Sequence, residues 1–296
     1  MNNMRIAHII NPVKVKENSD LYTAQPVTFR TMVKAKEESK YSNHINQYVI
    51  GYEEDESIFP KKAIALDFLN KSVLDYGDFE KTRKLPLIAD ILTPLKDFDV
   101  DYVVYTNVDI AIMPYFYDYI YEKIEKGSDS LIINRRVLKE LASDACMYSE
   151  IGDSHPGYDC FVFRKELIQK FKLGAVCIGA NWIGRIMYSN LIVFSNKLEI
   201  IKDAHLTFHI GDDGLWLQND YSEFDAHNKK EVYQQIGELI ELNLDDLKTK
   251  SLNNVIAFMD SWSVEKENIN IKTVKNISFI KRVKNKMKTI VIKLLE

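Results

Sequence analysis

The sequence predicts an α/β domain, with a mostly parallel sheet flanked by helices, followed by a helical C-terminal extension. Residues 5–51 read as strand, loop, helix and strand, which is how a parallel sheet begins. A strongly β-forming run, DYVVYT at 101–106, follows later and ends on the polar residues Asn107 and Asp109. A buried strand that ends on two oxygen-bearing side chains is typical of a sheet with a ligand site at its edge.

The opening elements follow from residue type and spacing. RIAHIIN (5–11) is rich in β-branched residues and ends before Pro12, so it is the predicted first strand. After a polar loop, VTFRTMVKAKEES (27–39) has apolar residues at helical spacing. INQYVIG (45–51) is the predicted second strand and ends at Gly51.

The later elements continue the alternation less regularly. In chain order we predict a strand near 62–68, a helix after Pro86, the strand at 101–106, a helix at 115–126, a strand from Ser128, a strand at 160–163 with a helix after it, a helix at 181–195, a strand ending in a polar loop within 198–216, and a helix at 231–250. The best boundary lies after 216–220. We therefore predict a catalytic domain at 1–220 and a helical extension at 221–296.

Composition and charge narrow the class of protein. The chain has 296 residues, of which 46% are hydrophobic and 28% charged, as in globular proteins. A net charge of -4 argues against a dedicated nucleic-acid binder. Three cysteines without CxxC spacing fit a reducing compartment. No apolar run reaches the roughly 18 residues of a spanning helix, so we expect a cytoplasmic protein.

The segment Asn107-Val108-Asp109 is the first candidate site. Alternation along a strand would place Asn107 and Asp109 on one face and Val108 on the other. Two oxygen donors on one face can hold a hard divalent cation that bridges the phosphates of a nucleotide. The alternative is a turn, because Asn and Asp often end strands.

The segment HPGYDCFVF (155–163) is the second candidate. His155 and Asp159 flank a Pro-Gly pair just before an apolar strand. Gly157 allows a ligand to approach the backbone closely, and Asp159 can bind a hydroxyl or act as a base. The alternative is a loop in which Asp159 caps a turn.

The segment LTFHIGDDGLW (206–216) is the third candidate. A strand delivers His209, a residue type that often binds divalent metals. The loop that follows supplies Gly211, Asp212, Asp213 and Trp216. The alternative for His209 is an ordinary core residue. A fourth segment, KTRKLP (81–86), carries cations that could reach a diphosphate from the helix preceding the central strand, or else form a solvated charge run.

Together these segments resemble nucleotide-sugar-dependent glycosyltransferases of the GT-A fold. YTNVDI is similar to the YxDxDI form of the DxD motif, which in that superfamily binds a divalent metal and the donor diphosphate. HIGDDGLW loosely resembles a C-terminal HxxGxxKPW-like segment of the family 8 branch. Two departures stand out: Asn107 replaces the first Asp of DxD, and the Lys of the second segment is absent.

The resemblance implies a set of roles for the candidate residues. Asp109, His209 and Asn107 would hold Mn²⁺ or Mg²⁺. Asp159 or Asp212 would position the sugar or acceptor hydroxyl, and one of them would act as base. Substrate would be bound by Arg83, Asn107, His155, Gly157, Gly211, Asp213 and Trp216. The expected reaction moves a sugar from a nucleotide-sugar donor to a glycan or lipid-linked acceptor.

The C-terminal tail, FIKRVKNKMKTIVIKLLE, interleaves cations with apolar residues. Residues 277–296 carry six Lys or Arg against one Glu, and helical spacing lines up an apolar stripe. Such a helix is suited to an anionic membrane surface, which predicts a peripheral position on the inner face of the cell membrane. The alternative is a terminal helix packed on the domain.

Two rival functions remain open. A sugar nucleotidyltransferase shares the sheet and the metal chemistry, but usually has a Gly-rich phosphate loop that INPVKVKENSD lacks. A catalytically inactive nucleotide- or glycan-binding module is favoured by Asn107. The Lys, Ile and Asn content is typical of AT-rich bacterial genomes, where such transferases commonly build capsule or lipopolysaccharide.

Overall fold

A computed structural model of the chain describes residues 4–138, 144–202, 204–211, 222–242 and 244–261. The chain divides into two compact units, Met1–Leu244 and Asp245–Glu296. The first unit contains the sheet, and the described part of the second is one helix at 246–261. The predicted boundary at 220 lies in a segment outside the described residues, and so does the basic tail.

Nine strands form one mixed sheet in the described part of the first unit, in the order β3-β2-β1-β4-β7-β6-β9-β5, with β8 paired to β6. Their bounds are β1 (Ile6–Ile10), β2 (Ile45–Val49), β3 (Ile64–Ala65), β4 (Tyr102–Thr106), β5 (Ile110–Ile112), β6 (Ser130–Leu138), β7 (Asp153–Arg164), β8 (Leu198–Ile201) and β9 (Thr207–Ile210). Strand β7 runs antiparallel to β4 and β6, and β5 runs antiparallel to β9. All other pairs are parallel, so the predicted mostly parallel sheet is confirmed.

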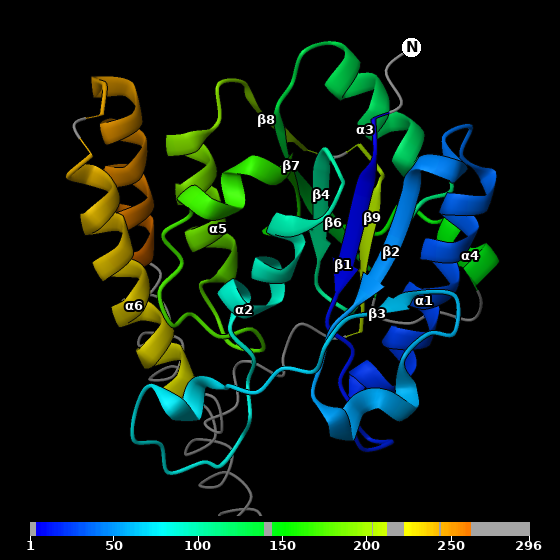
Figure 1. Ribbon diagram of the computed structural model, residues 1–296, viewed down its shortest axis with the longest axis horizontal. Coiled ribbons are helices and arrows are strands. Elements are labelled where there is room, and N and C mark those ends of the chain that lie inside the picture. Colours follow the sequence, from blue (N-terminus) through cyan, green and yellow to red (C-terminus); the bar gives the residue numbers. More distant parts are fainter. Residues whose placement is uncertain (1–3, 139–143, 203, 212–221, 243, 262–296) are drawn as a thin grey trace, which may run out of the picture. The chain divides into compact units, whose positions relative to one another are not determined.

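Helices cover both faces of this sheet (Figure 1). The α-helices are α1 (Asp20–Glu38), α2 (Ile88–Leu92), α3 (Phe116–Glu125), α4 (Asp144–Ser149), α5 (Ile183–Phe194) and α6 (Ser222–Ile240). Short 3-10 helices are η1 (Ser42–His44), η2 (Glu53–Ile58), η3 (Val73–Asp75), η4 (Thr93–Asp97) and η5 (Lys165–Lys170). Helices α1 and α3 lie on one face, and α2 and α5 lie on the other (Figure 1).

The central strand β1 shows why the sheet is buried on both sides. All five of its residues are buried, as expected of a parallel strand between two helical layers. Ile6 and Ile10 pack in one cluster with Met32 of α1 and Phe116 of α3. A continuous apolar strand therefore fixes the middle of the sheet and directs its carboxyl end toward the loops that follow.

Several element boundaries differ from the sequence prediction. Helix α1 begins at Asp20 and contains Pro26, although the sequence predicted a polar loop up to that proline. Burial of Ala24 and Val27 extends the helix across the proline. One predicted strand is two, β8 and β9, and the helix expected at 231–250 is α6 followed by the separate helix at 246–261.

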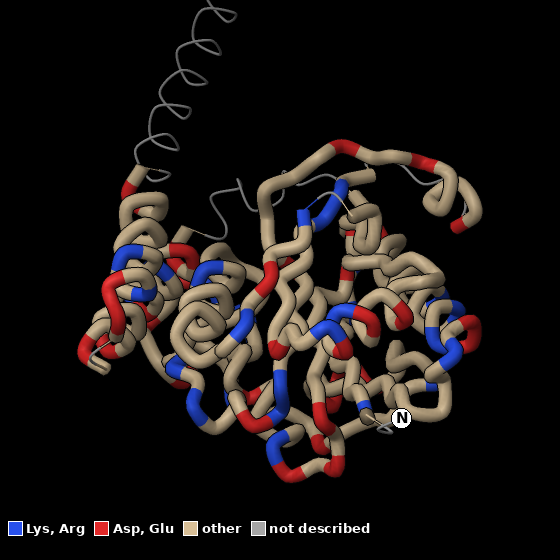
Figure 2. Tube along the Cα trace, turned by 90° about the horizontal axis from the view of Figure 1, so that it is seen from above, with Lys and Arg blue, Asp and Glu red and all other residues tan. Residues whose placement is uncertain are grey.

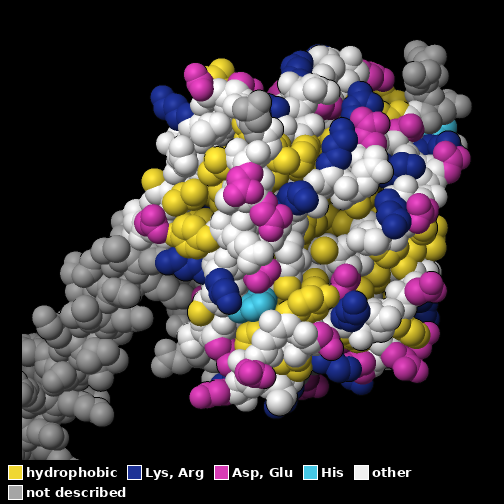
Figure 3. All heavy atoms as spheres, turned by 60° about the vertical axis from the view of Figure 1, so that its left-hand side comes forward, with side chains coloured by type: hydrophobic (Ala, Val, Ile, Leu, Met, Phe, Trp, Pro, Cys, Tyr) yellow, Lys and Arg dark blue, Asp and Glu magenta, His cyan; other side chains and the backbone are white. Residues whose placement is uncertain are grey.

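The described surface is mixed in character. Lys and Arg are interspersed with Asp and Glu along the chain (Figure 2). The face drawn in Figure 3 carries apolar side chains in patches bordered by groups of both charges. Among the described helices, none is long and apolar enough to cross a membrane.

Candidate active site

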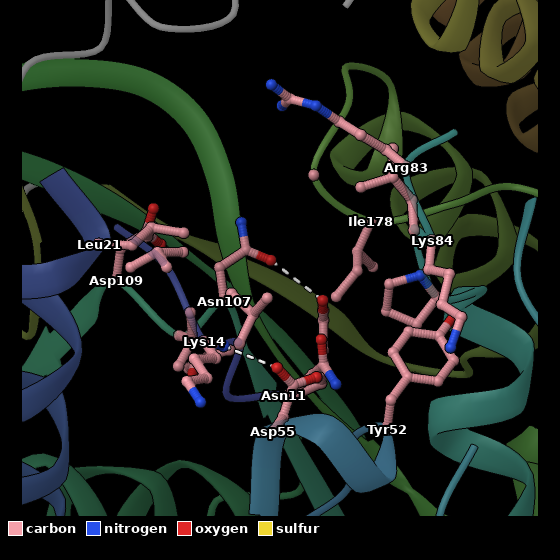
Figure 4. Close-up of a pocket in the computed structure, with 18 residues that line it drawn as sticks. Asn11, Lys14, Leu21, Tyr52, Asp55, Arg83, Lys84, Asn107, Asp109 and Ile178 are labelled. Carbon is pink, nitrogen blue, oxygen red and sulfur yellow. Dashed lines mark hydrogen bonds between the residues drawn. The ribbon is translucent and has the colours of Figure 1, made fainter. Parts of the chain in front are cut away.

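A cavity of about 390 Å³ lies at the carboxyl ends of β1 and β4. In open α/β sheets, ligands bind in the crevice outside the carboxyl ends of the strands. Asp109 and Leu21 lie on one side of the cavity, and Tyr52 and Lys84 lie on the other (Figure 4). Its lining comprises Asn11, Val13, Lys14, Val15, Leu21, Tyr52, Asp55, Arg83, Lys84, Leu85, Pro86, Tyr105, Thr106, Asn107, Val108, Asp109, Ile178 and Gly179.

The Asn107-Val108-Asp109 segment is a turn rather than a continuing strand. Strand β4 ends at Thr106, and the Ile110 N–H donates to the Asn107 carbonyl at 3.2 Å. The predicted alternation of faces is therefore wrong in its geometry, because the backbone reverses direction between β4 and β5. Both Asn107 and Asp109 nevertheless line the cavity.

Asp109 is paired with His209. Residue 110 is opposite His209 in the β5–β9 ladder, and His209 Nε2 lies 3.2 Å from Asp109 Oδ2. Burial alone would raise the pKa of Asp109, but the hydrogen bond and charge of His209, with the charge of Arg135, lower it below its ordinary value. Asp109 is thus an ionised carboxylate at neutral pH.

The other carboxylate oxygen of Asp109 distinguishes this pair from a simple ion pair. Oδ1 is buried and has no hydrogen-bond partner among the described residues. A buried polar atom without a partner is costly, and a ligand that completes it would offset that cost. An unsatisfied carboxylate oxygen beside an imidazole fits a divalent cation.

The protein itself would supply few ligands to such a cation. In the described part of the chain, no three His, Cys, Asp or Glu side chains converge. Mg²⁺ is commonly held by one or two carboxylates together with substrate phosphates and water. The arrangement therefore fits a cation that binds with a phosphate-bearing substrate.

Asn107 is held by neighbours on both sides. Its Nδ2 donates to Asp159 Oδ1 at 2.9 Å, and its Oδ1 accepts from the Tyr105 hydroxyl at 3.0 Å. Arg135 Nη1 in turn donates to Asp159 Oδ2 at 2.6 Å. Both carboxylate oxygens of Asp159 are therefore engaged.

Strand β7 brings Asp159 to this position through a bulge. Cys160 pairs with Ile133 and Tyr158 with Asn134, so Asp159 is an extra residue in the ladder. A second irregularity sets residues 155–157 opposite Arg135, since Asn134 pairs with Tyr158 and Arg136 with Ser154. The prediction of a loop before a strand at residue 160 was wrong, because β7 already begins at Asp153 and accommodates Pro156 at this irregularity.

Arg135 was not predicted. In sequence it belongs to Asn-Arg-Arg at the end of an apolar run, which reads as an exposed strand end. Its side chain is only 11% exposed because it faces the bulged strand. No local sequence signal distinguishes it from its neighbour Arg136.

His155 and Gly157 contact one another. The Gly157 N–H donates to His155 Nδ1 at 2.9 Å, and a Cβ at Gly157 would lie 2.7 Å from that nitrogen. Neither residue is among those lining the cavity. Their predicted contact with substrate stays a prediction.

Arg83 lines the cavity but is not on a helix. Residues 81–86 have no regular secondary structure, and α2 begins only at Ile88. The predicted helical position was wrong, because Pro86 disfavours helix in the residue before it. The neighbouring Lys84 pairs with Glu54 at 2.7 Å on the same wall.

The acidic segment at 52–60 supplies residues that the sequence did not single out. Asp55, on η2, is buried and its Oδ1 accepts from the Lys14 N–H at 2.7 Å. Burial raises the pKa of Asp55, an effect that the backbone hydrogen bonds oppose. Asp55 lines the same cavity as Asp109.

The third predicted segment is described only in part. His209 and Gly211 lie at the end of β9, and Gly211 has φ +113 with its N–H donating to the Leu138 carbonyl. A Cβ at Gly211 would lie 3.0 Å from Asp20 Cβ, so both backbone angle and space favour glycine. Asp212, Asp213 and Trp216 lie outside the described residues.

Comparison with known proteins rests on structure alone. No protein-family model matches the sequence, and no curated protein matches it. S. aureus TarS 1–349 in complex with UDP-GlcNAc matches with a TM-score of 0.50 at 12% identity, covering 84% of this chain and 70% of that chain.

Two further solved structures match less closely. The mannosyltransferase PcManGT from Pyrobaculum calidifontis, in complex with GDP-Man and Mn²⁺, has a TM-score of 0.48 at 11% identity, covering 88% of this chain and 72% of that one. A 4-diphosphocytidyl-2C-methyl-D-erythritol synthase from Anaerococcus prevotii has a TM-score of 0.39 at 12% identity, covering 77% and 97%. The likeness to TarS together with the sheet topology shows the fold: the chain has a GT-A-like, nucleotide-diphospho-sugar transferase fold.

Proposed function

We propose that this chain is a glycosyltransferase that takes a sugar from a nucleotide-sugar donor. One observation carries the proposal: a partly buried carboxylate, Asp109, is paired with His209 at the carboxyl edge of a GT-A-like sheet, and its buried Oδ1 has no hydrogen-bond partner among the described residues. A diphosphate-bound cation would satisfy that oxygen and bring the donor into the cavity.

Asp109 and His209 would hold Mn²⁺ or Mg²⁺, with Asn107 beside them. The cation, when bound, supplies neutralisation of the charge that builds on the leaving diphosphate. Arg83 lies on the opposite wall of the cavity and would add positive charge near the same group. The ionised state of Asp109 supports this role, because only a carboxylate attracts the cation strongly.

The far end of the cavity would take the nucleoside. Asp55 is a buried acceptor next to the aromatic ring of Tyr52, and both line the cavity. A nucleobase offers N–H donors at its edge and a flat face for an aromatic ring. These two features support a nucleotide in preference to a simple sugar phosphate.

The sequence offers two carboxylates, Asp159 and Asp212, as the base that activates the acceptor. For Asp159 to act as base, one of its contacts to Asn107 or Arg135 would have to break. We therefore propose Asp212 as the base and Asp213 and Trp216 as substrate-binding residues.

The acceptor is proposed to be a glycan or a lipid-linked sugar, in bacterial surface polysaccharide synthesis. The interleaved basic and apolar tail at 277–296 supports a cytoplasmic enzyme bound at the inner face of the membrane. A family 8-type relationship is part of this proposal and rests on the His209 segment. A sugar nucleotidyltransferase or an inactive binding module would share the donor site but would not transfer sugar.

The test is thermal unfolding with a panel of UDP-, GDP- and CMP-sugars, with and without MnCl₂. A ligand of the native state at about 100 times its Kd stabilises by about 2.7 kcal/mol. We expect one nucleotide class to raise the Tm, and only with metal. Product analysis with that donor then separates transfer or hydrolysis from binding alone. No shift with any donor would overturn the proposal.

A further inference from the structure

The hydrogen-bonding partners of Asn107 determine which way its side-chain amide points. An ionised carboxylate only accepts hydrogen bonds, so the atom of residue 107 that faces Asp159 must be a donor. Asn107 has that donor in Nδ2, and its Oδ1 accepts from the hydroxyl of Tyr105. Burial raises the pKa of Tyr105, which therefore stays protonated and keeps donating.

An aspartate at position 107 would disturb this arrangement. It would place a second carboxylate within hydrogen-bonding distance of Asp159, where Asn107 Nδ2 now lies at 2.9 Å. Two like charges at that distance repel unless they share a proton. Asparagine at 107 is thus matched to a carboxylate at 159.

Arg135 completes the arrangement from the other side. Its guanidinium donates to Asp159 Oδ2, and the side chains of Arg135 and Asp159 are 11% and 15% exposed. The bulge in β7 places Asp159 between Arg135 and Asn107, since a regular ladder has no extra residue there. The chain Arg135–Asp159–Asn107–Tyr105 therefore links three strands and the turn that carries Asp109.

We propose that Arg135, Asp159 and Asn107 form a positioning relay for Asp109, in which residue 107 is a hydrogen-bond connector and not a cation ligand. The relay fixes the first residue of the Asn107–Ile110 turn and thereby the direction of the Asp109 carboxylate. The role of Asp109 in holding the cation rests on the proposed function. The hydrogen-bonded connection from Arg135 through Asp159 to Asn107 does not depend on that function.

A reciprocal exchange of the two side chains, Asn107→Asp with Asp159→Asn, tests the relay. In this double variant the amide at position 159 can accept from Arg135 and donate to the carboxylate at position 107, so every hydrogen bond is kept. Asn107→Asp alone places two carboxylates together. Asp159→Asn alone lets the Asn107 amide turn over, because the Tyr105 hydroxyl can also accept. Asn43→Asp, on an exposed residue, is the matched control.

The first readout is the Tm of the full chain between pH 5.5 and pH 8, without ligand. For Asn107→Asp we expect a Tm near that of Asn43→Asp at pH 5.5 and lower by roughly 4 °C or more at pH 8. At pH 8 the two adjacent carboxylates are both charged and repel one another, and a shared proton relieves this repulsion in acid. The exchange variant should lose most of this pH dependence.

The second readout is the Kd of MnCl₂ in the presence of the donor found by the panel. Asn107→Asp should raise this Kd at pH 8 by about tenfold or more, and the exchange variant should recover most of the lost affinity. A connector predicts this rescue, whereas direct ligation through a carboxylate at 107 predicts that Asn107→Asp binds Mn²⁺ more tightly.

Each outcome decides the inference. If Asn107→Asp matches Asn43→Asp at every pH, or the exchange variant is no better than Asn107→Asp, the relay is wrong. If Asn107→Asp fails to fold while the exchange variant folds, the relay is supported. If no donor is found, the proposed function fails, but the pH dependence of the Tm still tests the relay.

Discussion

His209 Nε2, on β9, lies 3.2 Å from Asp109 Oδ2, in the turn that leads directly into β5, the antiparallel partner of β9 at the edge of the sheet. The pair keeps Asp109 ionised in a partly buried place, and it leaves Oδ1 without a hydrogen-bond partner among the described residues. A carboxylate held in this way is ready for a cation without first losing a proton.

Asp109→Asn should abolish metal-dependent donor binding. The substitution keeps the shape of the side chain but removes its charge, and we expect sugar transfer to fall by roughly 100-fold or more. The measurement is the MnCl₂-dependent rise in Tm with the donor, followed by the transfer rate. Asp97→Asn, an exposed carboxylate on η4, is the control and should behave as wild type. Metal dependence that survives in Asp109→Asn would contradict the assignment.

His209→Gln should change how stability depends on pH. In the wild type the lowered pKa of Asp109 contributes stability above its unfolded value of about 3.9, and this is lost as pH falls through the folded pKa. Without His209, burial dominates and raises the pKa of Asp109, so the variant should be destabilised at pH 7 by roughly 1–3 kcal/mol.

The check is urea unfolding of His209→Gln from pH 4 to pH 8, beside His44→Gln as control. The difference in free energy of unfolding between His209→Gln and His44→Gln should become smaller at lower pH, where Asp109 takes up a proton. A difference that is constant over the whole pH range would show that the charge of Asp109 does not depend on His209.

Asp55→Asn should weaken nucleotide binding while leaving its metal dependence intact. Asp55 lines the cavity and accepts from the Lys14 N–H, an interaction that an amide oxygen can keep. Loss of a charged acceptor for a nucleobase costs about 1.5 kcal/mol, or about tenfold in Kd. Calorimetry with the free nucleotide measures this, and Glu56→Gln on the exposed side of η2 is the control. Equal nucleotide affinity in Asp55→Asn and Glu56→Gln would show that the nucleobase does not bind at Asp55.

His8 should make the fold sensitive to acid. It is fully buried on β1, its Nδ1 lies 2.8 Å from the Tyr117 hydroxyl and its Nε2 lies 2.9 Å from the Thr106 hydroxyl. Burial lowers its pKa from 6.5 to about 3. Between these values the unfolded chain binds a proton that the folded chain does not, so the free energy of unfolding falls by about 1.4 kcal/mol per pH unit as pH falls.

His8→Gln removes that titration and keeps a polar side chain for the same partners. Its free energy of unfolding should therefore fall less steeply than that of the wild type between pH 6 and pH 4, whatever its absolute stability. Urea unfolding at several pH values measures the slope, and an unchanged slope would mean that another group titrates.

The local sequence was sufficient for much of the fold. Residues 6–10, 45–49 and 102–106 are short apolar runs of β-forming residues, and all three are strands. Their buried, parallel arrangement follows from a strand–helix–strand order. His209 also lies on a strand as predicted, because β-forming residues surround it.

The boundaries of several elements depended on packing. Helix α1 extends seven residues upstream of the predicted start, through Pro26, because Ala24 and Val27 are buried there. Pro156 lies inside β7 because a bulge removes the need for its missing N–H. Secondary-structure propensity alone predicts that the helix is interrupted at Pro26 and the strand at Pro156.

The sequence by itself determined the fold class and brought Asn107, Asp109 and His209 forward as candidates, because local periodicity and residue chemistry are readable along the chain. Only the tertiary structure decided that Asn107 contacts Asp159 and that Arg135 belongs to the site. These contacts join β6, β7 and the turn that follows β4, and their geometry depends on a one-residue bulge. A shift of one residue in register reverses the face of a side chain, so such partners are set by strand pairing between distant segments and not by local sequence.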